Sequence, residues 1–261
     1  LIVSAFAPVS DIRKTLTPQL SNDTDTVLLL IDLGAGLNRL AGSALAQVFG
    51  YVGDEAPDLD DAQRLKHFFQ VTQQLSQDQR LLAYHDRSDG GLLASVAEMA
   101  FAGRLGVDLV LDHVAGDHPE ALAALFAEEA GAVVQVREQD ADTVIAAYAE
   151  AGLGSCIHRI GEPNQDDALR IRLGGAILME APRRDLHRIW AETSYRIQSM
   201  RDNPECAEQE FASLPHTGDA GINVRQTFDM TENVAAPMIN TGVRPSIAIL
   251  REQGVNGHVE M

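Results

Sequence analysis

The chain has 261 residues and carries 38 acidic against 20 basic side chains, a formal charge of −18 at pH 7. This surplus of negative charge repels nucleic acid and anionic membrane surfaces, so the sequence argues against both as partners. Hydrophobic residues make up 45% and charged residues 22%, which is ordinary for a globular protein with a sizeable core. No apolar run approaches the roughly 18 residues of a membrane span. The two cysteines, Cys156 and Cys206, cannot form a disulfide framework and favour a reducing, cytoplasmic setting.

Both ends of the sequence are unusual for a complete protein. The first residues, LIVSAFAPVS, already have a strand-like pattern and lack an initiating Met, and the last, NGHVEM, resemble the first turn of a helix. The N-terminal stretch has neither the basic segment nor the cleavage site of a signal peptide. We therefore expect a piece of a longer polypeptide.

Short apolar runs alternate with longer amphipathic segments along most of the chain. Apolar runs bounded by turn residues predict strands, and apolar residues at helical spacing predict helices. The expected strands are 1–7, 26–33, 81–84, 107–111, 131–136, 155–161, 168–173 and 177–180, with a polar turn at Pro163-Asn164, and the expected helices are 44–49, 63–75 (apolar face Leu65, Phe68, Phe69, Thr72 and Leu75), 92–100, 119–129, 140–151 and 186–200. This alternation predicts an α/β fold in which a mixed sheet packs against helices.

A loop containing glycines, residues 34–43, follows the apolar strand TVLLLIDL and precedes a helix. The order suggests a dinucleotide-binding fingerprint, but Arg39 stands where the third glycine belongs. The phosphate-loop pattern fails as well, because no Gly-Lys-Ser/Thr is present. A glycine loop near a bound anion and a plain turn both remain open.

The stretch 81–102 has the strongest functional pattern. A short buried strand is followed by the string HDRSDGG, residues 85–91, and then by an apolar helix. Carboxylates can hold a hard cation, and a helix start offers free N–H groups and a positive dipole end to a phosphate. The string therefore points to a cation-bound phosphate. Alternatively, Ser88 or Asp89 only caps the helix, and the glycines only permit a tight turn.

The other candidate residues give weaker signals. The eight histidines are scattered without an HxxxH or HExxH pair, and the best placed, His85, fits an ordinary hydrogen-bonded side chain. Cys156 is predicted in the core and Cys206 on the surface, without a partner histidine nearby. Glu128 and Glu129 are predicted to end a helix, where carboxylates oppose the dipole; this hints at a role, and a solvated face is the simpler alternative.

The C-terminal part changes character. Residues 201–242 are polar, contain several prolines and glycines, and have few periodic apolar positions, which predicts a linker laid over a surface. SIAIL at 246–250 then predicts the first strand of a further domain.

Four strings occur in one order along the chain: HDRSDGGLLASVAEMAFAG, DNPECA, FDMTENVAAP and REQGVNGHVEM. With them, essentially the whole chain resembles phosphoribosylformylglycinamidine synthase in its large, single-chain form. The resemblance implies a synthetase core of two similar halves followed by a class I glutaminase domain. Residues 1–185 resemble the C-terminal α/β domain of the second half, which belongs to the aminoimidazole ribonucleotide synthetase-like superfamily. Residues 186–244 resemble an irregular and helical connector, and 245–261 the truncated start of the glutaminase domain.

The resemblance also implies an activity, an ATP-dependent C–N ligase of purine biosynthesis with a glutamine amidotransferase. Such an enzyme converts formylglycinamide ribonucleotide, glutamine and water to the amidine, glutamate, ADP and phosphate. Asp86 matches a magnesium ligand at the nucleotide site of the second half, and Ser88 matches a residue that contacts ATP or ADP there. Asp89 and Glu129 are weaker candidates. This nucleotide site is regarded as auxiliary and structural in the family.

The catalytic residues of such an enzyme fall outside this sequence. This piece is therefore expected to be inactive alone and to depend on the remaining domains of the same polypeptide, in the cytoplasm. The family's Leu-Gly-Gly-Ser-Ala is replaced here by Leu40-Ala41-Gly42-Ser43-Ala44, so close backbone approach is harder at Ala41. Two other functions stay open: a kinase-like relative such as a selenophosphate or aminoimidazole ribonucleotide synthetase, which would lack the REQGVN segment, and a non-catalytic scaffold domain.

Overall fold

The computed structural model describes residues 4, 6–9, 11–216 and 224–239, and single positions at 241, 242, 244, 246, 248 and 250. The chain forms two separate units, Leu1–Asp219 and Ala220–Met261. Four residues of the strand predicted at 1–7, positions 247 and 249 of that predicted at 246–250, and all of 251–261 lie outside the described residues. The predicted division at 185 and 244 stays a prediction.

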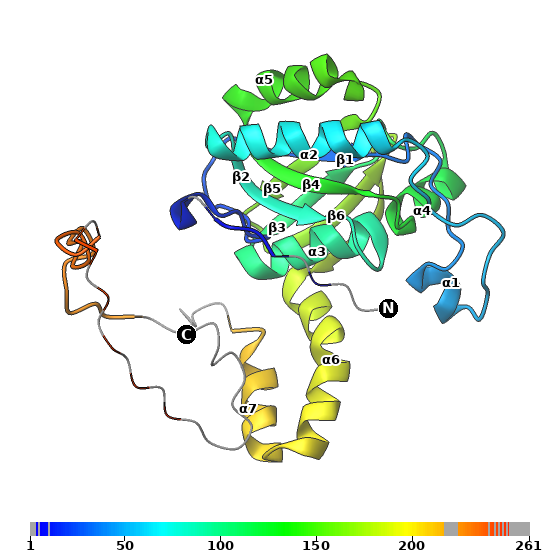
Figure 1. The fold of residues 1–261 in the computed structure, drawn as a ribbon. Coiled ribbons are helices and arrows are strands. Elements are labelled where there is room, and N and C mark those ends of the chain that lie inside the picture. Colours follow the sequence, from blue (N-terminus) through cyan, green and yellow to red (C-terminus); the bar gives the residue numbers. More distant parts are fainter. Residues whose placement is uncertain are drawn as a thin grey trace. The chain divides into compact units, whose positions relative to one another are not determined.

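A seven-stranded sheet forms the centre of the first unit (Figure 1). Its spatial order is β2-β4-β1-β5-β3-β6-β7, and all neighbouring strands are antiparallel except β3 and β6. The strands are β1 (Thr26–Asp32), β2 (Leu81–Asp86), β3 (Gly106–Val110), β4 (Gly131–Arg137), β5 (Ile157–Asn164), β6 (Ala168–Leu173) and β7 (Ala176–Pro182). The predicted α/β class with a mixed sheet is confirmed.

Helices cover both faces of this sheet (Figure 1). One face packs against α2 (Ala62–Gln77), α5 (Glu138–Tyr148) and the π-helical turn η2 (Ala149–Leu153). The other packs against α3 (Gly91–Gly103), α4 (His118–Phe126) and the start of α6 (Arg183–Arg201). The remaining elements are η1 (Ile12–Lys14), α1 (Ala44–Val48) and α7 (Pro204–Ser213). Among the described residues, none of these helices combines the length and apolarity needed to cross a bilayer.

The interior strand β1 is buried at every position. Leu28 and Leu30 contact the core under α3 and α4, whereas Val27, Leu29 and Ile31 contact the core under α2 and α5. Successive side chains of a strand point to opposite faces, so an unbroken apolar run fits a strand that is covered twice. The prediction that 26–33 is covered on both faces is confirmed.

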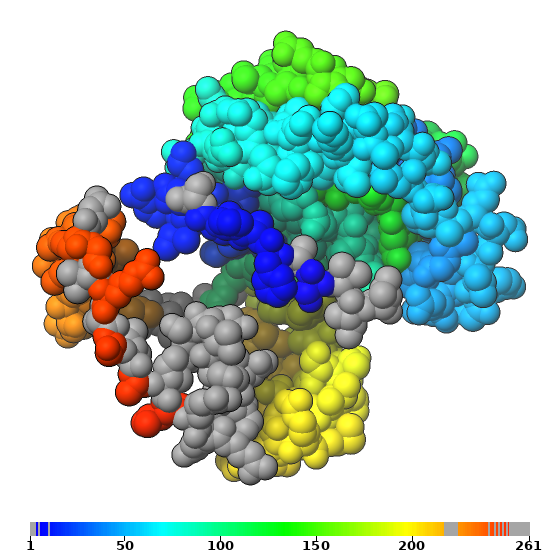
Figure 2. Space-filling model, in the orientation of Figure 1, coloured from blue at the N-terminus to red at the C-terminus, as the bar shows by residue number. Residues whose placement is uncertain are grey.

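The segment around α1 projects from one side of the first unit (light blue in Figure 2). It exposes the apolar side chains of Val48, Phe49, Tyr51 and Val52. Backbone hydrogen bonds from Ala41 and Gly42 to the carbonyls of residues 55 and 52 close it into a compact loop. Ala41, where the family motif has glycine, is buried inside it.

Three local predictions were wrong. On α2 only Phe68, Thr72 and Leu75 are buried, and Leu65 and Phe69 are exposed because a narrower stripe reaches the core. The turn placed at Pro163-Asn164 lies inside β5, which pairs with β3 through those residues. The helix predicted at 119–129 ends at Phe126, so Glu128 and Glu129 lie in a loop.

The first part of the predicted linker is also wrong, since it forms the helix α7. Asn203 caps this helix and Pro204 occupies its first turn, two start signals that polar composition obscured. The ring of Phe211 stacks on Tyr195 of α6 at 4.3 Å between centroids. The cysteine predictions are confirmed, since Cys156 is buried and Cys206 exposed.

Candidate functional site

The end of β2 and the loop that follows it carry three exposed polar side chains. Asp86 is the last residue of β2, and Ser88 and Asp89 follow it on the surface. Helix α3 then begins at Gly91 with Gly90 as its N-cap, and no side chain caps it. The alternative that Ser88 or Asp89 only caps the helix is therefore wrong. Neither of these two side chains makes a hydrogen bond within the described part of the chain, so both are available to a ligand.

Backbone geometry explains why glycine stands at both Gly90 and Gly91. Gly90 has φ +84° and Gly91 has φ +71°, a region that residues with a Cβ rarely adopt. A Cβ on Gly91 would also lie 2.7 Å from the Phe126 carbonyl carbon and 2.8 Å from the Ala127 oxygen. The start of α3 therefore packs directly on the backbone that leaves α4.

A buried ion pair connects the loop to the end of β1. Arg87 Nη2 donates to Asp32 Oδ1 at 2.5 Å, and the two side chains are only 1% and 5% exposed. Arg87 Nε also donates to the Glu129 carbonyl at 2.7 Å. The Asp32 carboxylate accepts from the backbone N–H groups of Gly34 and Gly36 as well. Asp32 at the end of β1 thus connects the 34–43 loop to the HDRSDGG string.

Glu129, predicted as a weaker metal candidate, is fully buried. Its Oε1 accepts from Arg39 N at 3.0 Å and Nε at 2.7 Å, and its Oε2 accepts from Arg39 Nη2 at 2.8 Å. Hydrogen bonds to Glu129 and then Asp60 raise the pKa of Arg39. Gly34 is required here because a Cβ would lie 2.7 Å from the Glu129 side chain. Both Glu129 oxygens therefore accept hydrogen bonds from Arg39, the residue at the position where a dinucleotide-binding fingerprint has its third glycine.

The neighbouring Glu128 connects two helix starts. Its Oε1 accepts from the backbone N–H groups of Ala44 and Gly90, both at 2.8 Å. These positions open α1 and α3, where the dipole favours an anion. Glu128, predicted to oppose the dipole of the helix it ends, instead lies at the favourable N-terminal ends of two other helices.

A small cavity of about 110 Å³ lies beside the Asp32–Arg87 pair. His113 and His158 contribute to its polar lining, and Leu30, Val114 and Ala124 to its apolar lining. Burial lowers the pKa of His158. A larger, open hollow of about 580 Å³ lies at the other end of β1, around Asp25 and Arg137, away from the predicted residues.

The structure brings Asp86, Ser88 and Asp89 onto one loop and leaves Glu129 buried in a separate ion pair. Sequence reasoning missed Arg87 and Asp32 as organising residues, and it gave Glu128 only a hint of a role. The available signal was an Asp that ends an apolar strand and an Arg inside a glycine-containing polar string. Among the described residues, no three His, Cys, Asp or Glu side chains gather closely enough to enclose a metal ion.

This fold and this strand–loop–helix arrangement belong to a known class. Residues 25–174 match the family described as AIR synthase related protein, C-terminal domain, and the chain belongs to that family. The superfamily predicted from the sequence is thereby confirmed.

Solved structures of one protein from Thermotoga maritima have the same fold. The chain is similar to PurL from this organism complexed with ATP, with a TM-score of 0.53, 16% identity, and coverage of 66% of this chain and 27% of that one. Similarity to PurL complexed with FGAR has a TM-score of 0.53, 18% identity, and coverage of 67% and 30%. The structure of phosphoribosylformylglycinamidine synthase II from the same organism matches with a TM-score of 0.52, 15% identity, and coverage of 66% and 27%. The chain therefore spans less than a third of these proteins.

Proposed function

We propose that this chain is part of a large, single-chain phosphoribosylformylglycinamidine synthase, an ATP-dependent ligase of purine biosynthesis with a glutamine amidotransferase. Family membership, the PurL-like fold and the four strings that include HDRSDGG and REQGVN support this proposal. In the same proposal, residues 1–185 form the C-terminal domain of the second synthetase half, 186–244 the connector, and 245–261 the start of the glutaminase domain. The setting is the cytoplasm, and the remaining domains of the polypeptide supply the catalytic residues.

The proposed role of the first unit is to hold a magnesium–nucleotide complex at the loop after β2. The observation that carries it is the exposed set of Asp86, Ser88 and Asp89, none of which caps α3. Side chains that stabilise a turn are normally hydrogen-bonded within it, and the Ser88 and Asp89 side chains are not. A ligand explains them better than the turn does.

The donor set at this loop suits magnesium bound with a nucleotide. Mg²⁺ in proteins commonly takes one or two carboxylates and completes its shell with phosphate oxygens and water. Asp86 offers one carboxylate, Ser88 a hydroxyl that can donate to a nucleotide oxygen, and Asp89 a second acid on the same loop. When bound, the cation would neutralise phosphate charge, which the acidic chain otherwise repels. Glu129 does not fit this set, since Arg39 engages both of its oxygens.

Nucleotide content of the purified, intact protein tests this proposal. Asp86→Asn keeps size and hydrogen bonding but removes the charge that a hard cation needs. It should lower both the bound ATP or ADP and the increase in melting temperature that magnesium produces. Ligand at about a hundredfold over its Kd stabilises a protein by about 2.7 kcal/mol, so the shift is measurable. Ser88→Ala should act in the same direction but less, since it removes one hydrogen bond of about 1 kcal/mol.

The matched control is Asp142→Asn, an exposed aspartate on α5. It should leave nucleotide content unchanged. Equal nucleotide content in the native protein, Asp86→Asn and Asp142→Asn would remove Asp86 from the site.

Two alternatives give different outcomes in the same preparation. The family match, to a protein related to AIR synthase, also suits a kinase-like relative that uses ATP without glutamine. Glutamine-dependent amidine formation by the intact protein would exclude that relative. Absence of any nucleotide binding would favour a scaffold domain.

A further inference from the structure

Tyr84 holds the Asp86 carboxylate from the side of the sheet that faces α2. The two residues are two apart on β2, so their side chains lie on one face, and Tyr84 packs against the core under α2 and α5. The Tyr84 hydroxyl donates to Asp86 Oδ1 at 2.5 Å. This geometry leaves Asp86 Oδ2 without a hydrogen bond in the described part of the chain.

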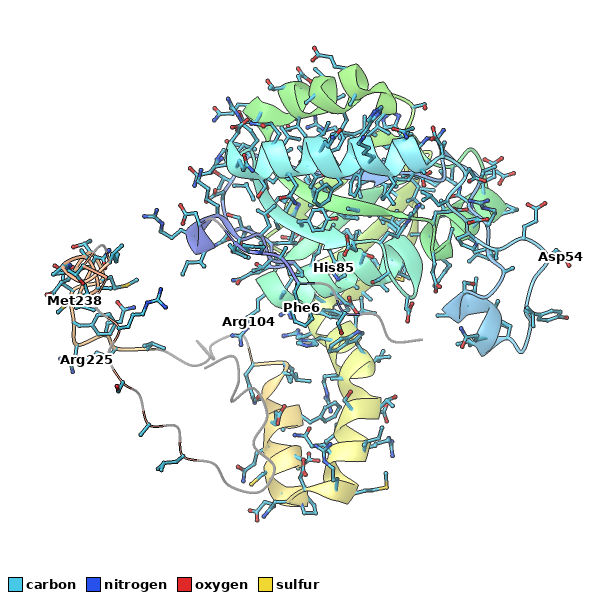
Figure 3. The ribbon with its side chains drawn as sticks, in the orientation of Figure 1. Phe6, Asp54, His85, Arg104, Arg225 and Met238 are labelled. Carbon is cyan, nitrogen blue, oxygen red and sulfur yellow. The ribbon has the colours of Figure 1, made fainter. Side chains whose placement is uncertain are left out.

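His85 holds the backbone of Asp86 from the opposite face. Its Nδ1 lies 2.6 Å from the Asp86 carbonyl oxygen, and its Nε2 lies 2.8 Å from Glu98 Oε2 on α3. Trp190 Nε1 on α6 then donates to Glu98 Oε1 at 3.0 Å. Close polar contacts through Glu98 and His85 therefore connect α6 to the end of β2. Figure 3 places His85 between the sheet and the start of α6.

Aromatic packing fixes the α6 end of these contacts. The ring of Phe101 on α3 stacks on His187 with 4.6 Å between centroids and an interplanar angle of 7°. Trp190 lies 5.9 Å from the same Phe101 ring in a tilted arrangement. The indole N–H is thus directed at Glu98 although 57% of the residue is exposed. Tilted aromatic pairs of this kind prefer one orientation, so the donor position is defined.

We propose that Tyr84, Glu98 and Trp190 are positioning residues for Asp86, and that the contact of α6 with α3 thereby tunes cation–nucleotide binding at the loop. The inference rests on the proposed role of Asp86 as a magnesium ligand. A cation held by few protein oxygens depends strongly on how each is oriented, and residues that hydrogen-bond a metal ligand commonly change metal affinity. Polar interactions at exposed positions contribute little to folding stability. Substitutions that remove them should therefore change the metal affinity with little change in the melting temperature.

Manganese binding to the intact protein in the presence of ADP provides the test. Electron paramagnetic resonance counts free Mn²⁺, and the difference between the native protein and Asp86→Asn isolates this site from others. Tyr84→Phe removes one hydroxyl and should weaken Mn²⁺ binding roughly tenfold. Trp190→Phe keeps an aromatic ring against Phe101 but removes the N–H, and should weaken binding about threefold because it acts through two other residues.

Tyr195→Phe is the matched control. This hydroxyl on α6 also donates to a carboxylate, Glu208, but it lies in the α6–α7 contact. It should leave Mn²⁺ affinity unchanged. Glu98→Gln provides a second variant in case Tyr84→Phe does not fold, and it too should weaken Mn²⁺ binding at an unchanged melting temperature.

The possible results separate the two proposals. Loss of the site in Asp86→Asn together with native Mn²⁺ affinity in Tyr84→Phe, Glu98→Gln and Trp190→Phe would overturn the positioning roles and keep the proposed function. Native Mn²⁺ binding in Asp86→Asn would overturn both. Weakened binding in the three variants, with Tyr195→Phe unaffected, would support the inference.

Discussion

Replacing Arg87 with methionine should destabilise the protein strongly, because it breaks the most buried ion pair near the candidate site. The Arg87 and Asp32 side chains are 1% and 5% exposed and lie 2.5 Å apart. Methionine fills much of the same space with an unbranched apolar stem but donates no hydrogen bond. Within the described part of the chain, Asp32 would keep only the backbone donors of Gly34 and Gly36.

The expected magnitude follows from burial. Removing one partner of a buried pair costs about 3–5 kcal/mol, since the other charge stays behind without compensation. The two backbone donors still solvate Asp32 in part, so we expect the lower end, about 3 kcal/mol. Adding Asp32→Asn to Arg87→Met should recover part of this loss, because the uncompensated charge is then gone.

Urea unfolding followed by circular dichroism measures this difference, with Arg196→Met as the control. Arg196 pairs with Glu192 on α6, but those side chains are 70% and 47% exposed. An exposed pair one helical turn apart contributes little to stability, because water and salt screen it. A loss in Arg87→Met no larger than in Arg196→Met would refute the idea that the Asp32–Arg87 pair organises this end of the sheet.

Three further predictions concern other parts of the chain. Gly91→Ala should destabilise the protein by at least about 2 kcal/mol, because the added Cβ would lie 2.7 Å from a backbone atom. Gly36→Ala is the control, since Gly36 also has a positive φ but nothing lies within 4 Å of the added Cβ, and it should cost about 1 kcal/mol. Melting temperatures of the two variants measure the difference. Burial lowers the pKa of His158 below its ordinary 6.5, so the unfolded chain takes up the proton first and stability falls as pH drops below 6.5; His158→Gln should lessen this fall in urea midpoints. Trypsin should cut first after Arg225, in a stretch whose described residues are exposed and carry no helix or strand, and first cleavage inside the sheet would contradict this.

The elements that could be predicted are those with a strong local pattern. The run from Thr26 to Leu33 has few non-apolar positions, so it fits a strand covered on both sides, and the apolar spacing after Gly91 fits a helix. The order of the strands could not be predicted, because β1 pairs with β4 and β5, which lie far along the chain. Helix α7 was not predicted either. Its two start signals, an N-cap and a proline in the first turn, lie in a stretch whose polar composition indicated a linker.

The candidate site likewise has a part that the sequence predicts and a part that it does not. Asp86, Ser88 and Asp89 were recognisable because they form one string between a strand and glycines. The connections that hold this string in place join it to residues near positions 32, 44 and 129, and no local spacing encodes them. Glu129 resembled a solvated helix end because its partner, Arg39, is remote in sequence.

The pairing of β1 has a consequence for how the protein is made. Ile31 pairs with Ala132 and Ile157, so the interior strand β1 emerges from the ribosome long before either of its neighbours. Until β4 has been synthesised, this run of aliphatic side chains and unpaired backbone groups has no native strand partner, and until β5 follows it has only one of its two. Contacts so distant in sequence slow folding and prolong exposure to aggregation. The nascent chain should therefore depend on chaperones until β5 is complete, and most of all when translation stalls between Asp32 and Ile157.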